Sequence, residues 1–358
     1  MKVKVAYDTG SAGGGNAVRG IGRNTNELLS KLNGKVEAFD FKSNDRKLKT
    51  GGYNIAHYTV FNPHQRSVPL TKPTRKVVLT IHDLIRLVYP TAYPPGIKGT
   101  LRFLVQKWLI KRNVDRIITI SETSKKDIVR FLGISPEKIS VVYLAPKKVF
   151  RYLELKQSLS LRDRSLEKAE VRKQFGLPDH FVLYVGDVNF NKNLMTLADA
   201  CKAIKIPLVM AGKTTTSKPD NHPENKPFAD FLKKYGVDKD IIRLGFVEDE
   251  DLVKIWNLAT VYCQPSYYEG FGLILLESMA CGVPVVASRI NAHTEIGGEA
   301  CVYADPKKVS DLAEKIKFVV NSPERQKEYI KKGEARVKQF TWTKTAQETL
   351  KIYAQVAD

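Results

Sequence analysis

Short apolar runs alternate with longer amphipathic stretches along most of this chain, and that alternation limits the fold more than any other feature. The runs have the length of buried strands and fall into two sets: residues 3–7, 55–58, 77–81, 116–120 and 139–142, and residues 181–185, 207–211, 241–244, 261–264 and 283–287. Helical patterns lie between them, for example at 24–32, 99–112 and 124–132. Because strands that alternate with helices pair in parallel, we expect an α/β protein with one doubly wound sheet in each half.

The two halves meet within residues 147–178, and the 358 residues suffice for two domains. Within this join, residues 153–173 are polar, charged and helical in pattern. Residues 321–358 are also helical in pattern and contain Phe340-Thr341-Trp342-Thr343, an aromatic cluster that we interpret as a docking point. We therefore place domains at 1–165 and 166–340, followed by a C-terminal helix at 341–358.

Several functional classes are disfavoured by composition. No apolar run approaches the roughly 20 residues of a membrane helix, and residues 1–8 have the pattern of a first strand and not of a signal peptide. The four cysteines, Cys201, Cys263, Cys281 and Cys301, are scattered and form no C-x-x-C pair, which is typical of reduced core residues. The histidines show no zinc-ligand spacing. We expect a cytoplasmic protein without a bound metal or cofactor.

The charge is unevenly distributed. The chain carries +20, and residues 1–180, with 34 Lys and Arg against 15 Asp and Glu, carry +19 of it. A one-sided basic domain points to an anionic partner, either lipid headgroups, a lipid-linked phosphate or nucleic acid. Solvated lysine-rich faces are the alternative explanation. The sequence contains no RNA-binding signature with stacking aromatics, which argues against nucleic acid.

The segment 268–288 combines a glycine turn, two acids, a short apolar helix and a buried strand. Gly270 and Gly272 allow the backbone to approach a ligand closely, and the helix that they open has free N–H groups and a positive dipole end. Glu269 lies in the turn and Glu277 lies eight residues further on, within the helix. A phosphate site flanked by two carboxylates suits a phosphorylated sugar. An ordinary strand–turn–helix corner with solvated glutamates is the alternative.

This segment resembles the signature of the retaining glycosyltransferases of the GT-B fold, the large family 4 or group 1 that includes many mannosyltransferases. That signature is Glu, seven residues, Glu, with Gly-Phe-Gly after the first acid and Ala-x-Gly-x-Pro-Val-Val after the second. The resemblance implies two Rossmann-like domains, an acceptor-binding first domain and a donor-binding second domain, with the last helix crossing back to the first. It implies a metal-independent, retaining transfer from a nucleotide-diphosphate sugar, with GDP-mannose favoured and UDP-sugars open.

The resemblance also assigns roles to residues. Glu269 binds the donor sugar hydroxyls as a catalytic residue, Glu277 binds the ribose hydroxyls, and a second catalytic residue, His82, contacts the donor sugar. The other donor-binding residues follow from the matching motifs: Gly22, Gly186, Lys192, Gly212, Lys213, Val247, Gly270, Phe271, Gly272, Leu273 and Ile274. One position departs from the family, because Asp187 stands where many members have an arginine that binds phosphate. Either the phosphate clamp is weaker here or Lys213 contributes to it.

By the same resemblance, the acceptor is a growing glycan or a lipid-linked carrier in polysaccharide biosynthesis, and the anionic carrier would account for the basic first half. The protein would then be peripheral on the inner face of the cell membrane. Two other hypotheses stay open. The protein is either a phosphorylase or hydrolase of the same fold that handles sugar phosphates, or a non-catalytic protein that binds anionic ligands.

Overall fold

The computed structural model describes residues 3–12, 20–32, 34–153, 161–219 and 222–358, with the backbone alone over 161–167. The chain divides into two compact units, residues 1–145 with 340–358, and residues 146–339. We placed the domain boundary at residue 165, whereas the change of unit lies between Ala145 and Pro146. The prediction followed the polar composition of the join, which begins after the chain has already left the first sheet.

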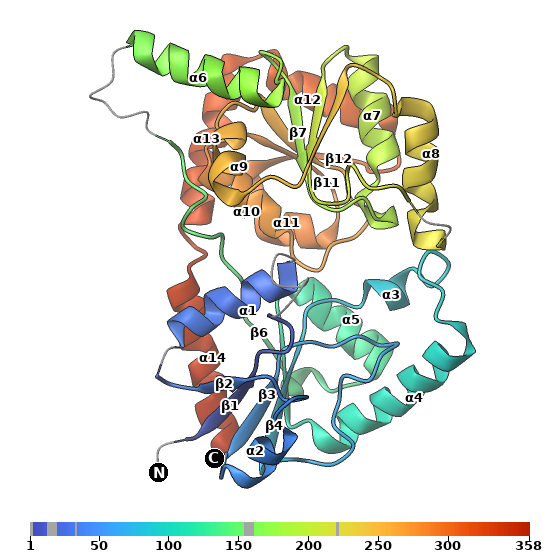
Figure 1. Cartoon of the computed structure of the whole chain (residues 1–358), viewed down its shortest axis with the longest axis vertical. Coiled ribbons are helices and arrows are strands. Elements are labelled where there is room, and N and C mark those ends of the chain that lie inside the picture. Colours follow the sequence, from blue (N-terminus) through green and yellow to red (C-terminus); the bar gives the residue numbers. More distant parts are fainter. Residues whose placement is uncertain (1–2, 13–19, 33, 154–160, 220–221) are drawn as a thin grey trace. The chain divides into compact units, whose positions relative to one another are not determined.

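The first unit contains a six-stranded parallel sheet in the order β2-β1-β3-β4-β5-β6 (Figure 1). Its strands are β1 (Val5–Asp8), β2 (Glu37–Phe39), β3 (Ile55–Tyr58), β4 (Lys76–Ile81), β5 (Arg116–Thr119) and β6 (Ile139–Val141). Its helices are α1 (Gly20–Lys31), α2 (Asp45–Thr50), α3 (Ile85–Val88), α4 (Gly96–Asn113), α5 (Glu122–Leu132) and α14 (Trp342–Ala357), with a 3₁₀ turn at Pro136–Lys138.

Alternate residues of β4 face the two helical layers of this unit. Val77 and Leu79 pack with α4 and α5, whereas Val78 packs with α14. The helix α5 shows how local sequence sets these elements, since the Ser121 hydroxyl caps its first turn by accepting from the Ser124 N–H at 2.9 Å. Gly133 ends it with a φ of 62°.

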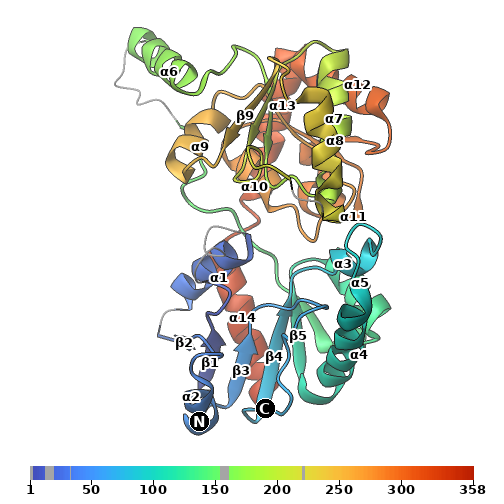
Figure 2. The ribbon, with the colours of Figure 1, turned by 45° about the vertical axis from the view of Figure 1, so that its right-hand side comes forward.

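The C-terminal helix α14 belongs to the first unit, where it runs along the sheet (Figures 1 and 2). Its apolar face contributes Ile352, Tyr353 and Val356 to the core under β1, β3, β4 and β5. The Thr345 hydroxyl donates to the Tyr143 carbonyl at 2.7 Å, 202 residues away along the chain. The first unit is therefore completed by the last residues of the chain.

The second unit contains another six-stranded parallel sheet, in the order β12-β11-β10-β7-β8-β9. Its strands are β7 (Val182–Val185), β8 (Leu208–Ala211), β9 (Ile241–Gly245), β10 (Val261–Gln264), β11 (Val285–Ser288) and β12 (Cys301–Ala304). Its helices are α6 (Leu161–Phe175), α7 (Leu194–Ala203), α8 (Lys226–Tyr235), α9 (Asp249–Trp256), α10 (Leu273–Ala280), α11 (Asn291–Gly297), α12 (Val309–Val320) and α13 (Pro323–Val337), with 3₁₀ turns at Phe190–Lys192, Pro223–Asn225 and Gly298–Ala300. This arrangement confirms the predicted fold of two Rossmann-like doubly wound domains.

The strand order reverses once in each sheet, between β1 and β3 in the first and between β7 and β10 in the second. Neighbouring loops diverge at such a point, and open parallel sheets bind ligands there, beyond the carboxyl ends of the strands. In the second unit, the loops that follow β7 and β10 carry the segments around Lys192 and Glu269.

Candidate active site

Glu269 and Lys192 meet beside the reversal point of the second sheet. The Lys192 Nζ lies 2.7 Å from Oε1 of Glu269, and the two side chains are only 16% and 14% exposed. The same oxygen accepts from the Gln264 amide at 2.9 Å and from the Ser266 hydroxyl at 2.7 Å. All three bonds go to Oε1, and no residue within the described ranges donates to Oε2. The carboxylate is thus held on one side and can accept hydroxyl groups of a ligand on the other.

The charge of Glu269 is stabilised by its surroundings. Burial raises the pKa of the carboxyl, but the ammonium of Lys192 and, after it, the Ser266 hydroxyl favour the charged form, so the pKa is held below its usual range. A buried carboxylate that is kept charged is a strong acceptor for hydroxyl groups.

The turn after Glu269 opens α10 with a left-handed residue. Gly272 has a φ of 98°, and a Cβ at this position would lie 3.0 Å from Cδ1 of Leu275 and 3.3 Å from Cδ2 of His293. Glycine is therefore required for both conformation and space. Leu273 and Ile274 follow as the first residues of α10, at the end of the helix where the sequence predicts an anion site. Glu277 lies within α10 and is 7% exposed.

Glycines pack against each other at the ends of β7 and β8. The N–H of Gly186 donates to Ala211 at 2.9 Å and that of Gly212 donates to Gly245 at 2.7 Å. Gly212 has a φ of 151°, and a side chain there would collide with the carbonyl oxygen of Gly186. Glycine is therefore required at position 212, where the backbones that follow β7 and β8 approach each other closely.

The remaining predicted residues of this unit border the same edge. Asp187 accepts a hydrogen bond from the Thr214 hydroxyl at 3.2 Å, so its carboxylate is paired with the loop that follows β8. Lys213 is exposed directly after Gly212, and Val247 is half-buried after β9. Gly270 and Phe271 are buried in the turn between Glu269 and α10.

Sequence reasoning missed His293, a fully buried side chain of α11. Its Nδ1 lies 3.1 Å from the carbonyl oxygen of Ser288, and because a carbonyl can only accept, Nδ1 carries the proton. Burial lowers the pKa of the imidazole to about 4, so it is neutral at pH 7. Its Nε2 has no hydrogen-bond partner among the described residues. Gln264 and Ser266 were missed as well, since a single polar residue at a strand end has no periodic or motif signal.

His82 and Gly22 lie in the first unit. His82 follows β4, is 9% exposed, and has an Nδ1 atom without a hydrogen-bond partner within the described chain. Burial lowers its pKa to about 4. It lines a small cavity of about 30 Å3 together with His57, Thr59 and Thr80, at the carboxyl ends of β3 and β4. Gly22 is buried in the first turn of α1, and residues 13–19 of the glycine-rich loop before it lie outside the described residues.

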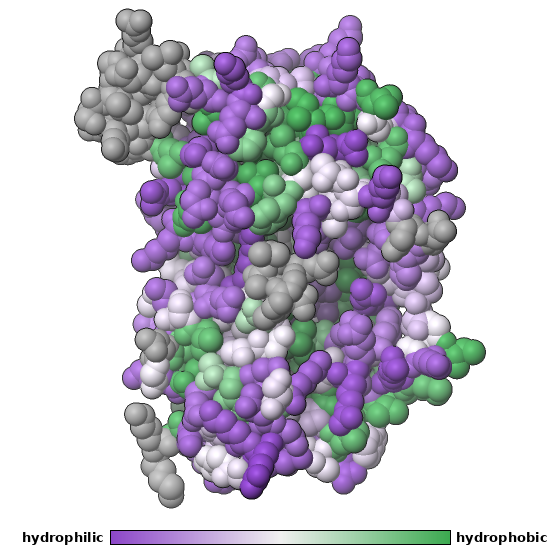
Figure 3. All heavy atoms as spheres, viewed as in Figure 1, coloured by the Kyte–Doolittle hydropathy of each residue, from purple (hydrophilic) through white to green (hydrophobic). Residues whose placement is uncertain are grey.

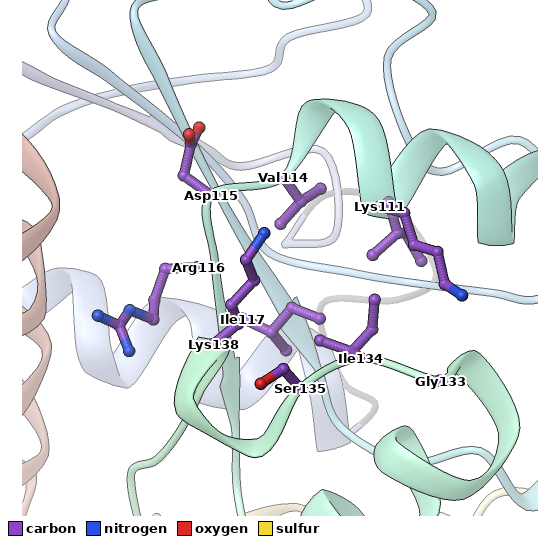
Figure 4. Close-up of a pocket in the computed structure, with 10 residues that line it drawn as sticks. Lys111, Val114, Asp115, Arg116, Ile117, Gly133, Ile134, Ser135 and Lys138 are labelled. Atoms are coloured by element: carbon purple, nitrogen blue, oxygen red, sulfur yellow. The ribbon is translucent and has the colours of Figure 1, made fainter.

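A second cavity, of about 130 Å3, lies at the opposite end of the first sheet (Figure 4). Val114 and Arg116 border it at the start of β5, and Ser135 and Lys138 border it before β6. Because it adjoins the amino ends of the strands, it is separate from the edge where parallel sheets bind their ligands.

The described residues offer neither a metal-binding cluster nor a membrane-spanning helix. They contain no group of three or more histidine, cysteine or acidic side chains placed to hold a metal ion. None of the helices that they form is long and apolar enough to cross a membrane.

Comparisons with known proteins match both units. Residues 3–145 match the family described as Glycosyltransferase Family 4, and residues 167–336 match Glycosyl transferases group 1. The O-antigen chain mannosyltransferase B of Escherichia coli is 26% identical over 84% of this chain and 75% of its own length. The serotype-specific mannosyltransferase WbdA of Escherichia coli is 25% identical over 78% of this chain, which takes in only 33% of WbdA.

Solved structures agree on the fold. The sucrose-phosphate synthase of Thermosynechococcus elongatus has a TM-score of 0.70 at 21% identity, covering 99% of this chain and 98% of that one. HepE of Anabaena, solved in complex with UDP and glucose, has a TM-score of 0.71 at 18% identity, covering 99% of both chains. With a glycosyltransferase family matched in each of its two Rossmann-like units, this chain is a glycosyltransferase of the GT-B fold.

Proposed function

We propose that this protein transfers a hexosyl group, with retention of anomeric configuration and without a metal, from a nucleotide-diphosphate sugar to a glycan or lipid-linked acceptor. The observation that carries the proposal is the Glu269 carboxylate, which is charged, is held on Oε1 by three donors and receives no hydrogen bond on Oε2 from the described part of the chain. It lies in the turn that opens α10, beside Lys192. One edge of one sheet thus offers an acceptor for sugar hydroxyls and donors for phosphate.

The reaction follows from where charge develops. Breaking the bond between the anomeric carbon and the phosphate oxygen leaves positive charge on the sugar and negative charge on the diphosphate. Lys192 and the leading N–H groups of α10 would stabilise the diphosphate, an electrostatic contribution worth several kcal/mol in a site that excludes water. Glu269 would orient the sugar, and Glu277 would bind the ribose hydroxyls. The acceptor hydroxyl attacks from the leaving-group side, and its proton passes to the departing phosphate oxygen.

GDP-mannose is the donor that we favour. The relatives named above, together with the MMP alpha-(1->4)-mannosyltransferase of Mycolicibacterium hassiacum, 27% identical over 72% of this chain, are mannosyltransferases by name. UDP-sugars stay open as donors, since the fold relative HepE was solved with UDP. For the acceptor, the +19 of residues 1–180 favours a carrier at an anionic surface.

The donor is tested by thermal shift with UDP, GDP, ADP and their sugar conjugates in the presence of EDTA. A ligand at about 100-fold over its Kd stabilises the folded protein by about 2.7 kcal/mol. Stabilisation by one base alone would identify the donor nucleotide. If folded protein responds to none of them, the metal-free donor site is refuted, and release of sugar phosphate without an acceptor would identify a phosphorylase.

Two variants separate the roles of the acids. Glu277→Ala should weaken nucleotide binding, whereas Glu269→Ala should reduce the transfer rate more than the nucleotide affinity. Unchanged turnover in both variants would refute the assignment of the site. The anomeric signal of the product in NMR tests retention, because an inverted product excludes the proposed stereochemistry.

A further inference from the structure

The outward side of α4 carries an exposed apolar stripe. Of the nine large apolar side chains that are strongly exposed in the described chain, five lie on this one helix, each more than half exposed: Ile97, Leu101, Leu104, Val105 and Trp108. Figure 3 shows apolar side chains at the margin of the molecule where α4 lies in Figure 1. Single exposed apolar residues are ordinary, but a contiguous patch of them marks a surface for interaction.

The spacing of these residues makes them one surface. They recur every three or four positions and so occupy an arc of about 100° along about 16 Å of helix. The opposite side of α4 faces the core through Gln106, Leu109 and Ile110. The core therefore has its own set of apolar residues on α4, and packing within the unit does not account for the stripe.

Cations border the stripe on both sides. Lys98 and Arg102 lie along one edge and Lys111 lies along the other, while the guanidinium of Arg112 is 5.0 Å from the centre of the Trp108 ring. The 18 residues of α4 include no acid. Lys111 also lines the 130 Å3 cavity, with Lys138 on its far side (Figure 4).

The one acid of that cavity is already paired. Asp115 lies 2.8 Å from Lys72, and in Figure 4 its carboxylate points away from the hollow. Lys111 and Lys138 thus extend the positive charge beyond the end of α4, and the acid that lines the cavity is paired.

We propose that α4 binds the surface of an anionic lipid bilayer, with the stripe inserted among the acyl chains and the flanking cations on lipid phosphates. A helix with a narrow apolar face, a tryptophan and basic flanks lies in the plane of a membrane interface. A second copy of this chain is a less suitable partner for the stripe, because two faces with the same positive charge repel each other. The inference rests on the proposed attraction of the basic half to an anionic surface, and it assigns that attraction to one helix.

Membrane binding by α4 is tested on the full chain by flotation with phosphatidylcholine vesicles, with and without phosphatidylglycerol. Binding should require phosphatidylglycerol and weaken as salt is raised. Leu101→Gln and Leu104→Gln should each lower the partition coefficient by about tenfold. Arg102→Gln should lower it by about fivefold and reduce its salt dependence. These side chains are exposed, so the variants should keep the thermal stability of the parent protein.

Matched controls are Val237→Gln, which alters an apolar residue that is 98% exposed, and Lys331→Gln, which alters an exposed lysine of α13. Both should bind vesicles like the parent protein. Binding that is unaffected by the leucine variants, or equal on both lipids, overturns the inference. So does self-association that Leu104→Gln abolishes in protein that does not float.

The nucleotide thermal shift of the same variants separates this inference from the proposed function. Leucine variants that lose vesicle binding but keep the nucleotide shift support a membrane role for α4. Vesicle binding by a protein that responds to no nucleotide would refute the donor site and leave the membrane surface standing.

Discussion

Replacing Lys192 with methionine would remove the one cation of the described residues that contacts Glu269, while keeping most of the side-chain volume. In the structure the ammonium lies 2.7 Å from Oε1, and both side chains are about five-sixths buried. Gln264 and Ser266 would still donate to the same oxygen, but they are neutral. The variant therefore keeps the hydrogen bonds and loses the charge balance.

The expected cost is that of a buried charge without its partner, about 3–5 kcal/mol of unfolding free energy. For a unit of this size that corresponds to a fall in melting temperature of about 6–20 °C. The cost should also depend on pH. In the parent protein the pKa of Glu269 lies below its usual range, so its contribution is complete near neutral pH and is lost as pH falls through that pKa.

In Lys192→Met the pH dependence of this contribution to stability reverses. Burial is no longer opposed by the ammonium and raises the pKa of Glu269 above its value in the unfolded chain. The protonated form then folds better than the charged one, so stability is lost as pH rises. The deficit of the variant should therefore be larger at about pH 7.5 than at about pH 5.

Urea unfolding at both pH values measures this, with Lys254→Met as the control. Lys254 lies 2.7 Å from Asp251 in the same unit, but these side chains are 45% and 33% exposed, so the pair should contribute under about 1 kcal/mol. Equal losses in the two variants, or a Lys192→Met deficit that does not shrink in acid, would refute the view that burial makes the Lys192–Glu269 pair important.

Three other outcomes are expected. Gly272→Ala should lower the free energy of unfolding by about 1–2 kcal/mol, because alanine is strained at a φ of 98° and its methyl group would press on Leu275. Nucleotide binding should fall as well, and an unchanged thermal shift with nucleotide would contradict the requirement for glycine in this turn. Tyr353→Phe removes the hydroxyl that lies 2.5 Å from Nδ1 of His57 and leaves that buried nitrogen unpaired. The free energy of unfolding, measured by chemical denaturation, should fall by about 1–3 kcal/mol. An unchanged free energy would mean that this hydrogen bond adds nothing to stability. Burial holds the pKa of His57 at about 3 and that of His82 at about 4, below the value of about 6.5 in unfolded chains. Because the unfolded state therefore binds protons first, the first unit should lose stability as pH falls from about 6.5 toward 4. Urea midpoints that stay constant over this range would show that these histidines are not neutral and buried.

Periodicity predicted most of the fold but missed two strands, of which β12 is an apolar and mostly buried segment and β2 is not. Ten strands were predicted at the positions where they occur, whereas β2 and β12 were not. Both are edge strands, and β2 is only Glu37–Phe39, with no residue fully buried. A short edge strand need not carry the continuous apolar run that identifies a central one.

The candidate site was predictable only in part. The spacing of the two glutamates and the glycines indicated Glu269 and the helix N-terminus that follows it. Its contact with Lys192, 77 residues away, depends on the strand order, which brings β7 beside β10. Gln264, Ser266 and His293 could not be found from sequence because their roles exist only once that topology is formed.

The position of α14 also has a consequence for how the chain is made. The second unit is one continuous stretch, whereas the first needs residues 340–358, which are synthesised only after the second unit. Until Ile352, Tyr353 and Val356 arrive, the face of the first sheet formed by Val5 and its neighbours has no cover. At ordinary translation rates the intervening 200 or so residues take about 10–40 s. The second unit can therefore finish folding first, and the first unit spends that interval as an incomplete sheet that invites aggregation or the help of a chaperone.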